Sequence, residues 1–153
     1  MVAYSFQRRF IGPIQLRTKR QTIRALRARH ARPGERVQLY FGMRSSACMK
    51  IIMDPVCIGV DDVRIDLSPL ADHPQPGDAT DLEAVAALVP IEINGIPVTG
   101  ADRDALAIAD GFDSCVWAGS ETPVSPWAAM IAFWMTTYGA AVFNGVLIRW
   151  EDR

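Results

Sequence analysis

Alternating apolar and polar positions predict that most of this chain forms short β-strands. An alternation of period two places successive side chains on opposite faces of a sheet, as a half-buried strand requires. The pattern, or a short apolar run, predicts strands over residues 2–7, 36–41 and 141–150, and residues 47–56 and 57–67 are expected to supply one or two more. The clearest hairpin lies over residues 91–98, where Asn94-Gly95 separates two β-branched runs. Pro97 confines the second arm of this hairpin to the edge of a sheet.

Helical periodicity is confined to a few segments. Ser125-Pro126 is typical of an N-cap followed by a first-turn proline, and Gly139 of a C-terminal stop. Between them the apolar side chains recur at helical spacing, which predicts a core helix. Two shorter helices are expected over residues 82–88 and 102–109, and a turn at Gly12-Pro13. The segment 16–30 fits either a helix with a thin apolar stripe or a strand through Gln21–Arg24 followed by an arginine-rich loop.

These elements predict an α+β fold in which mainly antiparallel strands, with two or three helices, form a small β-barrel. The length of 153 residues is that of one domain. A single domain over residues 1–153 is therefore expected. A segment rich in Pro, Gly and Asp, residues 66–82, indicates a loop, and we expect an insertion over residues 66–100.

Charge is distributed very unevenly along the chain. Residues 1–50 hold 12 of the 16 Lys+Arg and one of the 17 acidic residues, Glu35. The net charge of −1 therefore combines a segment of +11 with a remainder of −12. One interpretation is a polyanion site, most simply for RNA or a nucleotide. The other is internal charge pairing between the two segments.

Other features limit the class of protein. The three cysteines have no CxxC spacing and only two histidines accompany them, so no metal and no cofactor is expected. Buried free thiols in a reducing, cytoplasmic compartment are the preferred interpretation. No charge occurs between Glu121 and Arg149, but the helix expected there has about 13 residues, too few to span a bilayer. No membrane association is therefore expected.

The basic segment resembles the activating-signal-cointegrator homology (ASCH) domain of the PUA-like superfamily. The resemblance rests on Lys19-x-x-Thr22-x-Arg24 and on the following Pro33–Tyr40 segment. In the family signature G-x-K-x-x-E-x-R, Lys19 and Arg24 match, while Arg17 and Thr22 replace the Gly and the Glu. A bacterial branch, the acetylcytidine amidohydrolases, carries Lys-Thr-Ile-Thr-Ile-Arg at this place. The later sequence is also similar to ASCH-like proteins of phages and bacteria.

The resemblance implies a PUA-like β-barrel and a site around Lys19, Thr22 and Arg24. In the amidohydrolase branch the Lys is implicated as base and the Thr as nucleophile, so Lys19 and Thr22 are the candidate catalytic residues. A threonine hydroxyl needs a neighbouring base, and a lysine serves as one only when burial or nearby positive charge lowers its pKa. The family's Glu falls near Ala129, in a segment without acids, and Glu121 or Asp113 are the substitutes considered.

Three functions are consistent with these features. The first is binding of RNA or a modified nucleoside in a basic cleft, with Gln21, Arg24, Tyr40 and Arg44 as binding residues. The second is a hydrolase, acting on a nucleoside amide or on RNA. The third is an accessory protein whose basic segment docks an acidic protein partner. An acid within hydrogen-bonding reach of Lys19 or Thr22 would favour the second over the first.

Overall fold

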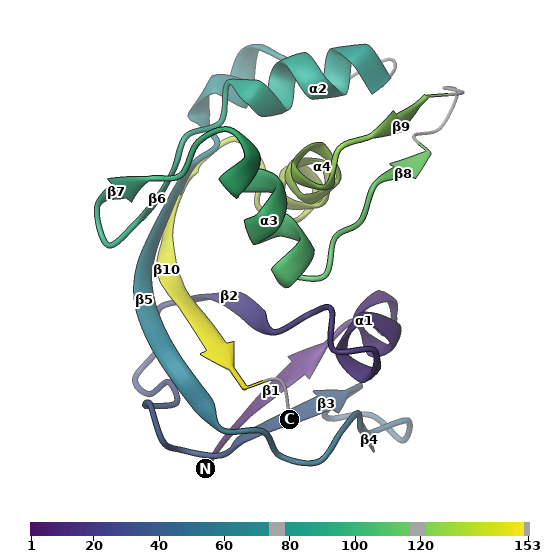
Figure 1. Ribbon diagram of the computed structural model, residues 1–153, viewed down its shortest axis with the longest axis vertical. Coiled ribbons are helices and arrows are strands. Elements are labelled where there is room, and N and C mark those ends of the chain that lie inside the picture. The colour runs from purple at the N-terminus through teal and green to yellow at the C-terminus, as the bar shows by residue number, and fades with distance from the viewer. Residues whose placement is uncertain (74–78, 117–121, 152–153) are drawn as a thin grey trace. The chain divides into compact units, whose positions relative to one another are not determined.

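The computed structural model of the chain describes residues 1–73, 79–116 and 122–151 (Figure 1). It contains two compact units, which we describe separately. Unit 1 comprises Met1–Asp61, Ala109–Gly111 and Val146–Arg153. Unit 2 comprises Asp62–Ile108 and Phe112–Gly145. Part of the loop expected over residues 66–82 lies outside the described residues.

The described residues form an α+β structure with four α-helices and mostly antiparallel sheets. Short 3₁₀ segments lie at Arg8–Phe10 and Ser68–Asp72. The helices are α1 (Ile11–Gln15), α2 (Ala79–Ala87), α3 (Ala101–Ala109) and α4 (Pro126–Tyr138). The strands are β1 (Val2–Phe6), β2 (Gln21–Ala25), β3 (Val37–Phe41), β4 (Met49–Lys50), β5 (Cys57–Asp66), β6 (Ile91–Ile93), β7 (Ile96–Pro97), β8 (Cys115–Val116), β9 (Pro123–Val124) and β10 (Val142–Trp150).

The strands pair in three sheets, in the orders β1-β3-β4, β2-β10-β5-β6-β7 and β8-β9. Pairing among the described strands does not close any of these sheets into a barrel. β1 and β3 are parallel, whereas β4 pairs with β3, β6 with β5 and β7 with β6 in antiparallel fashion. β7 lies at the end of its sheet, which confirms the edge position expected from Pro97.

In unit 1, the parallel pair β1–β3 has one strongly hydrophobic face. Val2, Tyr4 and Phe6 are buried along β1, and they pair in register with Val37, Leu39 and Phe41. Partners in register project to the same side of a sheet, so one face carries all six apolar side chains. The intervening pair Ser5–Tyr40 projects to the opposite face.

The ambiguous segment 16–30 contains the strand β2, and Lys19 lies in the short irregular stretch between the turn at residues 16–17 and this strand. Gln21, Thr22 and Ile23 are all buried, so both faces of the start of β2 are covered. A strand covered on both sides lacks the simple polar–apolar alternation that identifies half-buried strands. This is why the sequence pattern fits a helix as well as a strand.

In unit 2, α4 begins and ends where the sequence indicates. The Ser125 hydroxyl accepts a hydrogen bond from the Ala128 backbone N–H at 3.1 Å, and Pro126 follows it in the first turn. Gly139 ends the helix with φ +66°. Trp127, Met130, Ile131 and Trp134 are buried, as expected for a core helix, whereas Tyr138, the last residue of the expected apolar stripe, is 43% exposed. Asn94 and Gly95 have positive φ and form the expected turn between β6 and β7.

Three expectations are wrong or incomplete. The strand expected over residues 47–56 is limited to the two residues of β4. Gly12-Pro13 does not form a separate turn but lies inside α1. A proline is tolerated there because the first N–H groups of a helix have no partner within it. The expectation of buried thiols holds for Cys57, whereas Cys48 and Cys115 are exposed, and all three are free.

Candidate functional site

Lys19 is the most deeply buried charged residue of unit 1 among those described. Its side chain is 2% exposed, and its ammonium group donates hydrogen bonds to the Asp110 carbonyl oxygen and, at 3.1 Å, to Asp110 Oδ1. Asp110 is 5% exposed. The ammonium nitrogen also lies 4.7 Å from the ring centroid of Phe10 and 5.6 Å from that of Phe6. We call Lys19 and Asp110 the lysine pair.

Burial shifts the ionisation of both members of the lysine pair. Desolvation lowers the pKa of Lys19 to about 8, although the Asp110 carboxylate acts in the opposite direction; Arg24 and Arg9 lower it further. Desolvation also raises the pKa of Asp110, against the effect of the Lys19 charge. The mechanism expected from the sequence requires a lysine with a lowered pKa, and the burial of Lys19 provides it.

Three consecutive residues hold Lys19 and its neighbour in place. The Ala109 carbonyl oxygen accepts a hydrogen bond from the Arg20 backbone N–H at 2.8 Å. Asp110 binds the Lys19 ammonium. Gly111 has φ +95°, and a Cβ added to it would lie 2.8 Å from Lys19 Cδ. The positive φ and the close approach of the lysine stem both require glycine at this position.

Thr22 and Arg24 lie on one side of β2, as alternate residues of a strand must. Arg24 Nε donates to the Thr22 hydroxyl at 3.1 Å, and Arg24 Nη2 donates to the Ser5 carbonyl oxygen at 2.8 Å. Thr22 is 4% exposed. The hydroxyl is therefore a hydrogen-bond acceptor for Arg24, and the ammonium of Lys19 is directed to Asp110 instead.

Three arginine side chains lie over aromatic rings of the apolar face of β1–β3. The Arg24 guanidinium carbon is 4.7 Å from the Phe6 ring centroid, and that of Arg27 is 4.7 Å from the Tyr4 centroid. The Arg8 guanidinium carbon is 5.6 Å from the Phe41 centroid. At these distances each guanidinium is attracted to the ring by a cation–π interaction. We call the surface formed by these three arginines the arginine face.

The remaining candidates do not join this group. Tyr40 projects to the face of β1–β3 opposite Phe6, and the Lys50 ammonium lies 5.6 Å from its ring centroid. Arg44 is exposed in the loop after β3, with φ +76°. The structure therefore brings together Lys19, Thr22 and Arg24, but it places neither Tyr40 nor Arg44 beside them.

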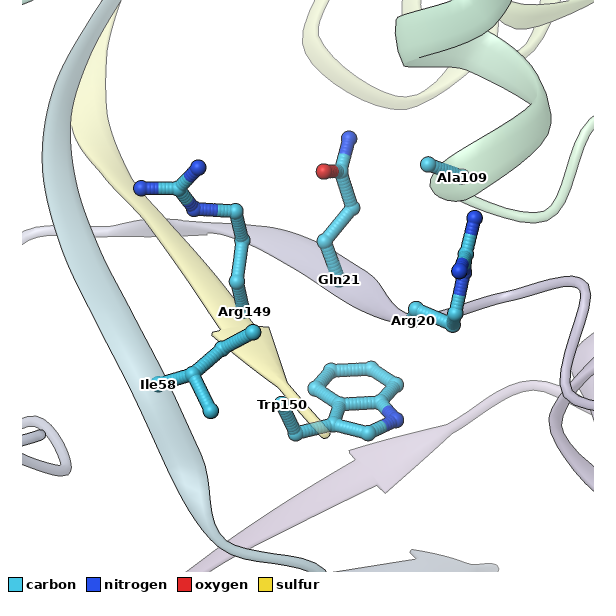
Figure 2. A pocket seen from close by; sticks show the side chains of 6 residues that line it. All are labelled: Arg20, Gln21, Ile58, Ala109, Arg149 and Trp150. Carbon is cyan, nitrogen blue, oxygen red and sulfur yellow. The ribbon is translucent and has the colours of Figure 1, made fainter. Parts of the chain in front are cut away.

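Gln21 lines a separate pocket of about 220 Å³ in unit 1 (Figure 2). The Arg149 guanidinium donates to Asp61 Oδ2 at 2.5 Å, and the Trp150 backbone N–H donates to the Arg20 carbonyl oxygen at 3.0 Å. We call this cavity the Trp150 pocket. Its lining residues are Arg20, Gln21, Ile58, Ala109, Arg149 and Trp150.

The sequence pattern does not reveal the partner of Lys19 or most of the Trp150 pocket. In the sequence Asp110 marks only the start of a turn before Phe112, and it lies 91 positions from Lys19. Arg149 and Trp150 are predicted only as part of the closing strand. The sequence signal that points to this pocket is the pair Arg149-Trp150 at the end of the closing strand, because basic residues are rare in the acidic remainder of the chain. The acid bonded to Lys19 is Asp110 and not Asp113; Glu121 lies outside the described residues.

Comparison with known proteins provides no relative: no family model, no curated protein and no solved structure matches the chain. Among the described residues, no three His, Cys, Asp or Glu side chains are grouped as metal ligands would be. None of the helices within that part of the chain is both long and apolar enough to cross a membrane. The ASCH resemblance therefore stays a proposal, and the chemistry of the site follows from its geometry alone.

The shifted pKa of Lys19 predicts a specific dependence of stability on pH. Between about pH 8 and about pH 10, unfolded Lys19 binds a proton that the folded protein has lost. The free energy of unfolding should therefore rise with pH in this range, by about 1 kcal/mol per pH unit at most from this group. Urea unfolding of wild type and of a Lys19→Met/Asp110→Asn variant, which lacks both titrating groups, measures the effect.

The difference between the two proteins isolates the lysine pair from all other titrating residues. We expect wild type to gain stability relative to the double variant as the pH rises through this range. A difference that is constant or decreases with pH would contradict the burial of a charged Lys19.

Proposed function

We propose that this chain is an ASCH-like, PUA-like protein that binds RNA or a modified nucleoside through unit 1. The observation that supports this proposal best is the arginine face, where Arg8, Arg24 and Arg27 lie over Phe41, Phe6 and Tyr4. Bases of single-stranded RNA stack on guanidinium planes, and the same groups bind phosphates. The arginine face offers both contacts.

The charges on this face are available to a polyanion. Arg8 and Arg27 are exposed and form no ion pair with any residue that the structure describes. Glu35, the single acid among the first 50 residues, is engaged by Arg29 and by the N-terminal amine. Asp110 and Asp54, from the acidic remainder, pair with Lys19 and Lys50, but no described acid pairs with Arg8 or Arg27. This favours the polyanion interpretation of the charge asymmetry.

The proposed binding residues differ from those expected from the sequence. Lys19 is covered and paired with Asp110, so its charge cannot contact a phosphate in this conformation. Thr22 is buried beneath the Arg24 side chain. We therefore assign binding to Arg8, Arg24 and Arg27, and assign to the lysine pair the support of β2 beneath them. A protein partner stays a prediction.

Removal of two arginines should weaken RNA binding without unfolding the protein. For Arg8→Ala/Arg27→Ala we expect a roughly tenfold loss of affinity for a mixed-sequence single-stranded RNA, since each contact contributes about 0.5–1 kcal/mol. The log–log dependence of affinity on salt should become shallower by about 0.7 for each phosphate that the variant no longer binds. Fluorescence anisotropy over a salt series measures both quantities.

Arg64→Ala is the control, because it also removes a solvent-accessible arginine, but one that lies on β5 in unit 2 and pairs with Asp66. This variant should bind RNA as wild type does. Equal losses in the control and the double variant, or no binding by wild type at low salt, would overturn the RNA proposal.

A second candidate function, hydrolysis of a nucleoside amide, is favoured by one observation. Asp110 supplies an acid in hydrogen-bond contact with Lys19, which the helix over residues 126–138 lacks. In this mechanism Lys19 takes the proton of the Thr22 hydroxyl and the oxygen attacks the amide carbonyl. The amine then leaves with a proton, and water releases the acyl group from Thr22. We rank this second because both side chains are covered.

Hydrolysis is tested by incubating the protein with N4-acetylcytidine and measuring release of cytidine by chromatography. A hydrolase should show a rate that rises with pH through about 8, as Lys19 loses its proton. Lys19→Met should abolish the activity, and Arg64→Ala should retain it. Absence of cytidine release by wild type above about pH 8 would remove this candidate.

A further inference from the structure

The Trp150 pocket of unit 1 is distinct in its residues from the arginine face. We infer that it is a binding site for a phosphate group, either free phosphate or the terminal phosphate of a nucleotide. This inference goes beyond the proposed function and does not depend on it, because it requires no contact of RNA with Arg8, Arg24 or Arg27. It rests on the donors that line the pocket, on the placement of Arg149 and on the size of the cavity.

The polar side chains of the pocket are mainly hydrogen-bond donors. Arg20 and Arg149 contribute guanidinium groups, Gln21 an amide and Trp150 an indole N–H. Figure 2 shows the Gln21 amide between the two guanidinium groups, with the indole ring beneath them. None of the described carboxylates lines the pocket itself, although Asp61 bonds to Arg149. Two guanidinium groups at one pocket favour an oxyanion over a cation.

Arg149 is held in position by two features of β5. A Cβ added to Gly59 would lie 2.8 Å from Arg149 Nη2 and 3.3 Å from Cζ, so the guanidinium lies close against the strand at a residue without a side chain. Asp61 accepts a hydrogen bond from Nη2. A guanidinium has five N–H donors, so this contact leaves others for a ligand. Its orientation is therefore set before any ligand binds, which reduces the entropic cost of binding.

Trp150 contributes a donor that has no acceptor among the described residues. Its side chain is 3% exposed, its ring packs edge-on against Phe6 and its backbone N–H is bonded to Arg20. No buried side-chain nitrogen or oxygen of the described residues lacks a partner, so the indole nitrogen is in contact with solvent. Figure 2 shows this nitrogen on the edge of the ring nearer Arg20. It is therefore available to a ligand.

The volume of the cavity limits the ligand to a small group. About 220 Å³ is below the ~300–1,000 Å³ that is usual for whole drug-sized ligands. It accommodates a phosphate together with part of an attached sugar. Ile58, 61% exposed at the rim, and Ala109 provide apolar surface for such a substituent. Free phosphate and a terminal phosphate are the two sources of this ligand.

The test is a titration of the full chain with inorganic phosphate at constant ionic strength, followed by the indole N–H signals in ¹H–¹⁵N NMR spectra. The four tryptophans give four such signals, and the spectrum of Trp150→Phe assigns the one from Trp150. We expect this signal to shift saturably in the millimolar range or below. Arg149→Ala should weaken binding about tenfold or more, as for loss of a charged hydrogen-bond donor. Arg64→Ala should bind as wild type.

Two further variants distinguish a built site from a general attraction of anions. Gly59→Ala displaces the Arg149 guanidinium while keeping its charge, and we expect it to weaken phosphate binding. Asp61→Asn keeps a side-chain oxygen that can accept from Arg149 Nη2 but removes the competing negative charge, and we expect it to strengthen binding. An unshifted Trp150 signal in wild type, or equal affinities in wild type and Arg149→Ala, would overturn the inference.

Comparison of ligands identifies the source of the phosphate. An RNA with a 5′ phosphate that shifts the Trp150 signal at lower concentration than its 5′-hydroxyl counterpart supports a nucleotide end. Tighter binding of inorganic phosphate than of either RNA supports free phosphate. Under this inference, the Trp150 signal of the Arg8→Ala/Arg27→Ala variant should still shift when inorganic phosphate is added. The RNA proposal and the phosphate inference can therefore be contradicted independently of each other.

Discussion

The ion pair between Lys19 and Asp110 is the constraint on which the organisation of unit 1 depends. Two charged groups removed from water cost several kcal/mol each unless they are paired and hydrogen-bonded to each other. Here the ammonium is bonded to both the carboxylate and the carbonyl of one residue, and two phenylalanine rings cover it. The start of β2 is thereby fixed against residues 109–111. Every candidate site residue on β2 takes its position from this attachment.

The register of β1 with β3 determines which aromatic rings lie beneath the arginines. It places Tyr4, Phe6 and Phe41 on one face, and the guanidinium groups of the arginine face lie over these rings. Gln21 contributes instead to the Trp150 pocket with Arg149, whose guanidinium is accommodated by Gly59. Unit 1 thus presents two basic features of different kinds: a surface of arginines that lie over aromatic rings, and a small pocket lined by two guanidinium groups.

The sequence predicts the features that depend on local patterns. The capped helix α4, the Asn-Gly turn and the strands β1, β3 and β10 all follow from spacing and turn residues. The sequence also groups Lys19, Thr22 and Arg24, but it does not supply Asp110, since no local pattern joins residues 91 positions apart. The sequence also does not predict that Tyr40 lies away from Lys19. The face on which Tyr40 lies depends on the pairing of β1 with β3, which is a tertiary property. Exposure of Cys48 and Cys115 likewise depends on folding and not on residue type.

The measurement that tests this account most directly is a double-mutant cycle on the lysine pair, using urea unfolding of wild type, Lys19→Met, Asp110→Asn and the double variant at neutral pH. Each single variant leaves one buried group without its partner and should be destabilised by about 3 kcal/mol or more. The double variant should be destabilised by clearly less than the two single variants combined, with a coupling of about 2 kcal/mol. Effects that simply add would show that Lys19 and Asp110 do not interact, and would contradict the structural basis of the site.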